Sequence, residues 1–122
     1  VVDDQISSPT SAQMLAEITA LILAQGREDV FGYLSEKGGL YHCAGTGSCS
    51  RYEWAKAILD LDPRKQEQVV KELLPAKSSE FPVPAKRPMV SVLCCDKLKQ
   101  KFHLLMTPYE TSFRWMMNNY LL

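Results

Sequence analysis

Three prolines stand within seven residues of this 122-residue chain, at Pro82, Pro84 and Pro88. Each proline fixes its own φ and lacks a backbone N–H, so residues 78–88 cannot form a regular helix. We therefore predict an extended loop that follows the surface. With 46% of its residues hydrophobic, a chain of this length fits a single domain with one modest core.

Helical periodicity is clearest near the two ends of the chain. Thr10 and Gln13 have the spacing of a capping box, and Gly26 is a typical helix end, so we predict a helix over 11–25. Its apolar positions are Met14, Leu15, Ile18, Leu21 and Ile22. A last helix is predicted to start at Thr107-Pro108, with Glu110 in its first turn. It would give the core Phe113, Met116, Met117, Tyr120 and Leu121.

The elements between these helices are predicted to be short. We expect helices over 51–60 and 96–102 and strands over 40–44 and 90–93. Val1-Val2 is compatible with the end of a further strand, and residues 27–38 with a loop or a short extra helix. Residues 64–73 are compatible with a helix, followed by an extended segment near 72–77. Helices with a few short strands place the chain in the α/β class, as an α+β-like arrangement.

Charge and hydropathy each exclude one class of partner. Lys and Arg together number 14, as do Asp and Glu, and no basic run occurs, so we expect no nucleic-acid partner. No run of about eighteen apolar residues occurs, so we expect no membrane partner. The first 25 residues lack the features of a signal peptide, and we expect a cytoplasmic protein. Because the chain begins at Val1 without a methionine, we expect it to be a piece of a longer protein.

The cysteines and histidines do not predict a metal site. Cys43 and Cys49 are separated by five residues, and Cys94 and Cys95 by none, which fits no common zinc pattern. His42 and His103 are isolated from other potential ligands. We therefore expect reduced, structural thiols and no metal.

Residues 39–56, GLYHCAGTGSCSRYEWAK, contain two patterns that suggest enzyme sites. Gly45-Thr-Gly47 resembles a dinucleotide-binding loop, but Ser50 replaces its third glycine and no acidic residue follows a second strand. Tyr52 and Lys56 have the spacing of a catalytic Tyr-Lys pair, but only 51 residues precede them, too few for a nucleotide-binding half. Ser50 and Glu53 form a capping-box pattern instead. We interpret this stretch as a strand, a glycine turn and a capped helix.

Five motifs in order carry a resemblance to one family. They are residues 1–10 (VVDDQISSPT), 39–45 (GLYHCAG), 50–55 (SRYEWA), 82–88 (PVPAKRP), and 91–98 with SVL and KL. This succession resembles the C-terminal part of dTDP-4-dehydrorhamnose reductases, members of the extended short-chain dehydrogenase/reductase superfamily. The chain departs from the family at Ser7, where glycine is usual, and at Cys94 and Cys95, where an aspartate and a serine or threonine are usual. Residues 27–37 resemble a modest insertion.

The resemblance implies that residues 1–122 form a nucleotide-sugar-binding C-terminal domain. An N-terminal Rossmann domain, which this chain lacks, would bind NADPH or NADH and carry the catalytic Tyr and Lys. The parent enzyme would reduce dTDP-4-dehydro-L-rhamnose to dTDP-L-rhamnose, and this fragment would not be active alone. The implied partners are a dTDP-sugar, the chain's own Rossmann domain and a second copy in a possible homodimer. Apolar surface that the missing half would cover is expected to be exposed.

Two residues are the predicted substrate-binding side chains, and none is predicted to be catalytic. Arg87 lies on the proline-stiffened loop, where a guanidinium suits bidentate recognition of a diphosphate, and the resemblance assigns this position to that role. Gln5 would hold the sugar or nucleotide through its amide, although ordinary turn bonding explains it equally well. Lys86 is expected to be solvated. We interpret Trp54, Trp115 and His42 as core residues.

One alternative function stays open at this stage. A non-catalytic, reductase-like regulatory subunit, such as that of methionine adenosyltransferase, also carries an Arg-Pro loop and a similar ending. The motifs at residues 5–10 and 52–53 favour the reductase.

Overall fold

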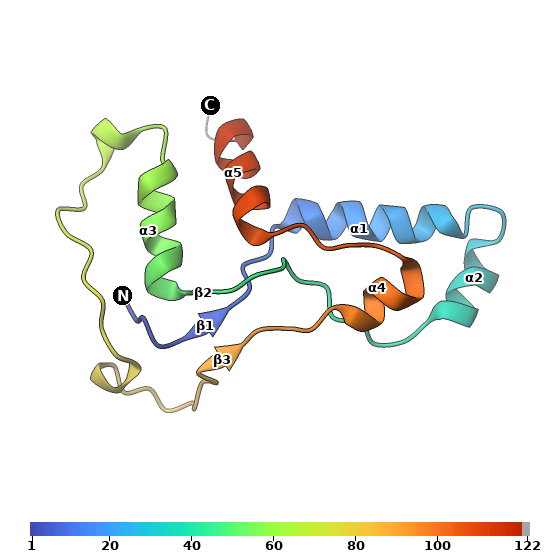
Figure 1. Cartoon of the computed structure of the whole chain (residues 1–122), viewed down its shortest axis with the longest axis horizontal. Helices are drawn as coiled ribbons and strands as arrows, with labels where there is room; N and C mark the ends of the chain where they lie inside the picture. Colours follow the sequence, from blue (N-terminus) through green and yellow to red (C-terminus); the bar gives the residue numbers. More distant parts are fainter. Residues whose placement is uncertain (121–122) are drawn as a thin grey trace.

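A computed structural model describes residues 1–120 and contains five α-helices and three two-residue strands (Figure 1). The helices are α1 (Ala12–Gln25), α2 (Val30–Lys37), α3 (Arg51–Leu61), α4 (Asp96–Phe102) and α5 (Tyr109–Tyr120). The strands are β1 (Ile6–Ser7), β2 (Cys49–Ser50) and β3 (Val90–Ser91), with 3₁₀ turns at Lys65–Glu67 and Ser78–Glu80. This confirms the predicted α/β class, with helices around a few short strands.

The three strands form one mixed sheet in the order β2-β1-β3. β1 pairs with β2 antiparallel, Ile6 opposite Ser50, and with β3 parallel, Ile6 opposite Val90. Residues from three distant parts of the chain meet in this sheet. Its pairing therefore depends on long-range contacts, which local sequence patterns do not predict.

Two small apolar clusters flank the sheet. One packs α1 against α4, through Met14, Ile18, Leu98, Phe102 and Met106. The other packs α3 against α5: the rings of Trp54 and Phe113 lie 4.3 Å apart between centroids. In the view of Figure 1, α3 and α5 lie above the sheet, and α1, α2 and α4 lie to its right.

Most predicted helices are confirmed, and the α3 cap is the one predicted. The Ser50 side chain accepts from the Glu53 N–H at 3.0 Å, and the Glu53 carboxylate accepts from the Ser50 N–H at 2.7 Å. The cap of α1 differs by one residue, because Ser11 rather than Thr10 accepts from the Met14 N–H. Thr10 instead accepts from the Gly45 N–H at 3.1 Å, which ties the start of α1 to the glycine turn.

Other helical predictions need small changes. Residues 27–38 contain the short extra helix α2, capped by Asp29. The last helix starts at Tyr109, directly after Pro108. Its residues Phe113 and Met117 are buried as predicted and Met116 is half-buried, while the predicted core position Leu121 lies outside the described residues.

Four predictions are wrong. Residues 40–44 form no strand; the pairing segment comes later, at β2, because the chain meets β1 only there. Residues 64–73 contain only the turn Lys65–Glu67, and their few apolar side chains find no large surface to pack against. His42 and Trp115 are exposed rather than in the core, since His42 is not in a strand and Trp115 faces a groove.

The proline-rich loop is confirmed as irregular. Between the turn Ser78–Glu80 and β3, residues 81–89 have no helix or strand, and all are exposed. Large apolar side chains are also exposed on several elements, among them Leu40, Val90, Val92, Leu93 and Leu105. Across residues 1–120, no helix has the length and apolarity that crossing a bilayer requires.

Candidate functional site

The sheet topology brings Gln5, Arg51 and Arg87 to one place. Gln5 directly precedes β1, Arg51 directly follows β2, and Arg87 lies shortly before β3. Because β2 runs antiparallel to β1 and β3 runs parallel to it, the end of β2 and the approach to β3 both lie beside the start of β1. The two residues predicted from the sequence therefore share a site, although they are 82 positions apart in the numbering.

These residues line a small pocket of about 140 Å³. Its lining consists of Gln5, Ile6, Ser7, Arg51, Arg87, Pro88 and Ser91. The lining residues carry two guanidinium groups, an amide and two hydroxyls, and none of them carries a carboxylate. Such a set suits an anion, because charge-assisted hydrogen bonds from arginine are the strongest that side chains offer to phosphate oxygens.

Neither guanidinium is used elsewhere in the described part of the chain. Within residues 1–120, the side chains of Arg51 and Arg87 form no ion pair or hydrogen bond. Lys86, next to Arg87, is exposed and does not line the pocket. Arg87 and Arg51 are thus the two cations of this pocket, and Lys86 offers a matched neighbour outside it.

Gln5 has a structural role as well. Its side-chain N–H donates to the Ser78 hydroxyl at 2.9 Å, and its backbone carbonyl accepts from the Arg51 N–H at 3.2 Å. One amide N–H and the amide oxygen remain for a ligand. Gln5 therefore links the start of the proline-rich loop to the start of α3, on either side of the pocket.

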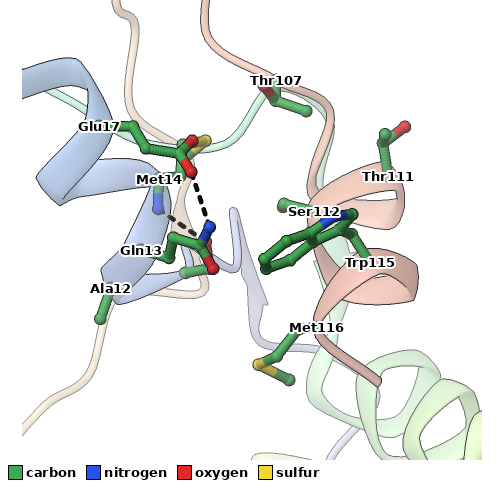
Figure 2. Close-up of a pocket in the computed structure, with 10 residues that line it drawn as sticks. Ala12, Gln13, Met14, Glu17, Thr107, Thr111, Ser112, Trp115 and Met116 are labelled. Carbon is green, nitrogen blue, oxygen red and sulfur yellow. Dashed lines mark hydrogen bonds between the residues drawn. The ribbon is translucent and has the colours of Figure 1, made fainter. Parts of the chain in front are cut away.

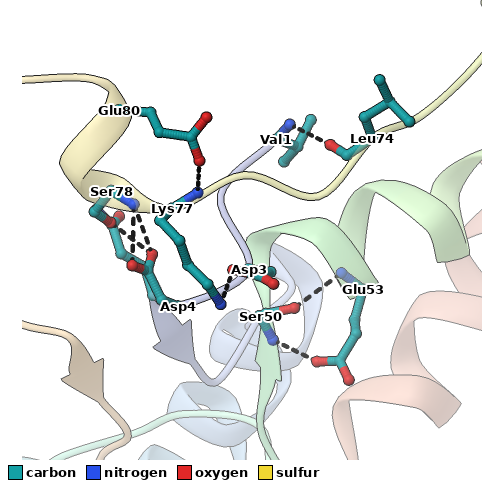
Figure 3. Close-up of polar contacts among 10 residues, drawn as sticks. Val1, Asp3, Asp4, Ser50, Glu53, Leu74, Lys77, Ser78 and Glu80 are labelled. Atoms are coloured by element: carbon teal, nitrogen blue, oxygen red, sulfur yellow. Dashed lines mark hydrogen bonds and ion pairs between the residues drawn. The ribbon is translucent and has the colours of Figure 1, made fainter.

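The proline-rich loop is held at both ends by residues near β1. At its start, the Ser78 hydroxyl and N–H donate to the Asp4 carboxylate, as Figure 3 shows. At its end, the Ile6 N–H donates to the Met89 carbonyl at 2.8 Å. The hydrogen bonds from Ser78, first the side chain and then the backbone, lower the pKa of Asp4. The segment that carries Arg87 is therefore fixed at two points.

A second, larger cavity lies between α1 and α5 (Figure 2). It measures about 790 Å³ and is mostly apolar, with Met14, Trp115 and Met116 in its wall. Some polar atoms at its edge already form hydrogen bonds within the chain, since the Gln13 amide donates to the Glu17 carboxylate at 2.7 Å. It contains none of the residues that the sequence predicts for ligand binding.

The glycine turn at 45–47 has a structural explanation. Gly47 has a φ of +85° and packs against the Tyr109 ring, and a Cβ on Gly45 would lie 2.6 Å from the Pro9 carbonyl oxygen. Nor do Tyr52 and Lys56 form a catalytic pair. Lys56 pairs with Asp60 at 2.6 Å, and this hydrogen bond raises the pKa of Lys56. The prediction that both patterns are structural is therefore supported by their contacts.

The four cysteines are free thiols in different surroundings. Cys49 is buried, Cys43 and Cys95 are half-buried, and Cys94 is exposed, so Cys94 lacks the burial that is typical of a structural thiol. Within the described residues, no three His, Cys, Asp or Glu side chains are grouped so that they could hold a metal ion.

Arg51 is the site residue that the sequence analysis missed. Ser50 and Glu53 identify it as the first residue of a capped helix, which is a structural signal only. Its place in the pocket depends on the pairing of β2 with β1, which sequence periodicity does not reveal.

Known proteins resemble this chain over most of its length. The protein-family model described as RmlD substrate binding domain matches residues 1–122. The dTDP-4-dehydrorhamnose reductase of Escherichia coli K12 is 30% identical over 122 residues, covering 97% of this chain and 38% of the relative. That of Burkholderia thailandensis is 36% identical over 106 residues, covering 84% of this chain and 35% of the relative.

Solved structures agree with these relatives. The dTDP-4-dehydrorhamnose reductase of Clostridium acetobutylicum has a TM-score of 0.74 at 29% identity, covering 97% of this chain and 37% of the other. The Bacillus anthracis enzyme, solved in complex with NADP, has a TM-score of 0.71 at 32% identity, covering 94% and 36%. This chain spans little more than a third of the length of each. It belongs to the RmlD substrate-binding domain family.

Proposed function

We propose that this chain is the C-terminal, nucleotide-sugar-binding part of an NAD(P)H-dependent reductase that converts dTDP-4-dehydro-L-rhamnose to dTDP-L-rhamnose in the cytoplasm. The observation that carries the proposal is the shared pocket of Gln5 and Arg87, the two residues predicted to bind substrate, which the sheet brings together. Relatives named dTDP-4-dehydrorhamnose reductase, matched over almost the whole chain, support the choice of substrate. They give no support to the regulatory-subunit alternative.

In this proposal, the chain binds and orients the substrate. The Arg87 guanidinium holds the diphosphate that links nucleoside and sugar, and the free part of the Gln5 amide bonds a neighbouring oxygen. A fixed diphosphate orients the 4-keto sugar outside the small pocket, which reduces the entropy lost in reaching the reactive geometry.

The nicotinamide cofactor is assigned to the rest of the longer protein. The glycine turn of this chain does not fit a dinucleotide, because Tyr109 packs against Gly47 and the Gly45 N–H is bonded to Thr10. A bound NADPH or NADH would supply the hydride for the keto carbon.

Titration of dTDP into the full-length protein by calorimetry tests the proposed binding role. Replacing Arg87 with alanine should weaken dTDP binding roughly tenfold to a hundredfold, as expected for loss of hydrogen bonds from a charged group. Lys86→Ala is the matched control and should bind dTDP like the unaltered protein. Equal affinity of the Arg87→Ala variant would exclude the role of Arg87, and absence of NAD(P)H oxidation with dTDP-4-dehydro-L-rhamnose would exclude the reductase.

A further inference from the structure

We infer that Arg51 and Arg87 together form a two-arginine clamp that selects a diphosphate over a single phosphate. Arg51 follows β2 and Arg87 precedes β3, so the two lining residues come from opposite neighbours of β1. The nature of the natural ligand rests on the proposed function, whereas the clamp itself can be tested with inorganic ions.

The first step concerns size. The cavity of about 140 Å³ has room for only a few water-sized groups, at about 30 Å³ for each water. A nucleoside or a sugar ring with its diphosphate would not fit inside. The linking diphosphate, with the nucleoside and sugar directed outward, is the part of a sugar nucleotide that this volume accepts.

The second step concerns charge. A diphosphate bridge carries one negative charge on each phosphate near neutral pH, and the pocket offers two guanidinium groups and no carboxylate. Each guanidinium can bond one phosphate in bidentate fashion, so both charges are matched. One phosphate would leave one arginine without an anionic partner.

The third step concerns the hydrogen-bond donors for the anion, which come from the Arg51 side chain and not from the backbone N–H groups at the start of α3. At the start of α3, the N–H groups of Arg51, Tyr52 and Glu53 are already bonded, to the Gln5 carbonyl, the Val2 carbonyl and the Ser50 hydroxyl. An anion in the pocket therefore finds the Arg51 guanidinium, which has no partner within residues 1–120.

The experiment compares ligands that carry one or two phosphates, using the full-length protein. Inorganic pyrophosphate, inorganic phosphate, dTDP and dTMP are titrated into the unaltered protein and into Arg51→Gln, Arg51→Lys and Arg51→Ala variants. Arg51→Gln should weaken pyrophosphate and dTDP roughly tenfold or more and change phosphate and dTMP less. Arg51→Lys, which keeps the charge but not the planar fork, should fall between. Arg114→Gln, an exposed arginine on α5 outside the pocket, is the matched control.

The outcomes separate the clamp from the proposed function. If the Arg51 variants bind pyrophosphate like Arg114→Gln while Arg87→Ala loses dTDP, the clamp is wrong and the proposed function stands. If pyrophosphate binding depends on Arg51 but dTDP does not bind at all, the clamp is supported and the proposed substrate is wrong. Failure of the unaltered protein to prefer pyrophosphate over phosphate overturns the clamp.

Discussion

Ser78 donates two kinds of hydrogen bond to the carboxylate of Asp4: its hydroxyl reaches Oδ1 at 2.7 Å, and its N–H reaches Oδ1 and Oδ2 at 3.1 and 3.0 Å. The two residues are 74 positions apart. This contact ties the loop that carries Arg87 to the segment that carries Gln5, so it positions both sides of the candidate site.

The Asp4–Ser78 contact should make stability depend on pH. The pKa of Asp4 is lowered in the folded protein, chiefly by the Ser78 hydroxyl and N–H, so its contribution is present above the unfolded pKa of about 3.9 and is lost as the pH falls through the folded pKa. Asp4→Asn should lower Tm at neutral pH and differ less from the unaltered protein in acid. A Tm difference that is as large at about pH 3 as at pH 7 would contradict this assignment.

The cluster between α1 and α4 should carry much of the stability on that side of the sheet. Leu98 is only 2% exposed, whereas Leu105 is 71% exposed. Leu98→Ala should lower the free energy of unfolding by about 2–5 kcal/mol, because it leaves a cavity. Leu105→Ala is the control and should change it by less than about 0.5 kcal/mol. Urea denaturation measures both, and similar losses would show that Leu98 does not belong to a packed core.

The capping box of α3 should be measurable in the same way. Ser50 is buried and accepts the Glu53 N–H, so Ser50→Ala should cost about 1–2 kcal/mol of folding free energy. Glu53→Gln keeps an oxygen that can accept from the Ser50 N–H and should cost less. A larger loss for Glu53→Gln than for Ser50→Ala would contradict the observed cap.

The four thiols should react in an order set by their exposure. Cys94 is exposed, whereas burial raises the pKa of the Cys43 and Cys49 thiols. Since the thiolate is the nucleophile, iodoacetamide should modify Cys94 first and buried Cys49 last. Mass spectrometry after timed quenching gives the order, and unfolding in urea should remove the differences. Early modification of Cys49 would show that its environment is open.

Local signals predicted the helices better than the strands. The Ser50–Glu53 cap and the prolines at 82–88 depend on neighbours in sequence, and both predictions are confirmed. The strands consist of two residues each, which is too short for an alternating pattern to locate them. The apolar run at 40–44 was therefore predicted to be a strand, although no strand forms there. His42 was misplaced for the same reason, because its predicted burial depended on that strand.

The site was predicted only in part. The resemblance in sequence pointed to Arg87 and Gln5, and the structure places them in one pocket, although their binding roles remain predictions. Arg51 was not predicted to be a site residue, because its neighbours in sequence identify it only as the first residue of a helix. Only the register of β2 against β1, a contact between residues more than forty positions apart, brings Arg51 to the pocket of the other two.

Gly47 offers the sharpest test of what the glycine turn does. Its φ of +85° lies in the region that favours glycine, so Gly47→Ala should cost about 1–2 kcal/mol of folding free energy through backbone strain. The added Cβ would also lie 3.2 Å from the Tyr109 ring, which adds to the cost. The exposed neighbour Ser48→Ala should be almost neutral.

The Gly47→Ala variant also tests whether the glycine turn is only structural or binds phosphate. The turn does not line the pocket of Arg51 and Arg87, so folded Gly47→Ala protein should bind dTDP with unchanged affinity, although its urea midpoint is lower. Calorimetry below the unfolding transition measures the affinity. A loss of dTDP binding comparable to that of Arg87→Ala, in a protein that circular dichroism shows to be folded, would return the phosphate site to residues 45–47. Unchanged affinity would leave the two arginines as the groups that hold the diphosphate, since they are the pocket's cationic donors.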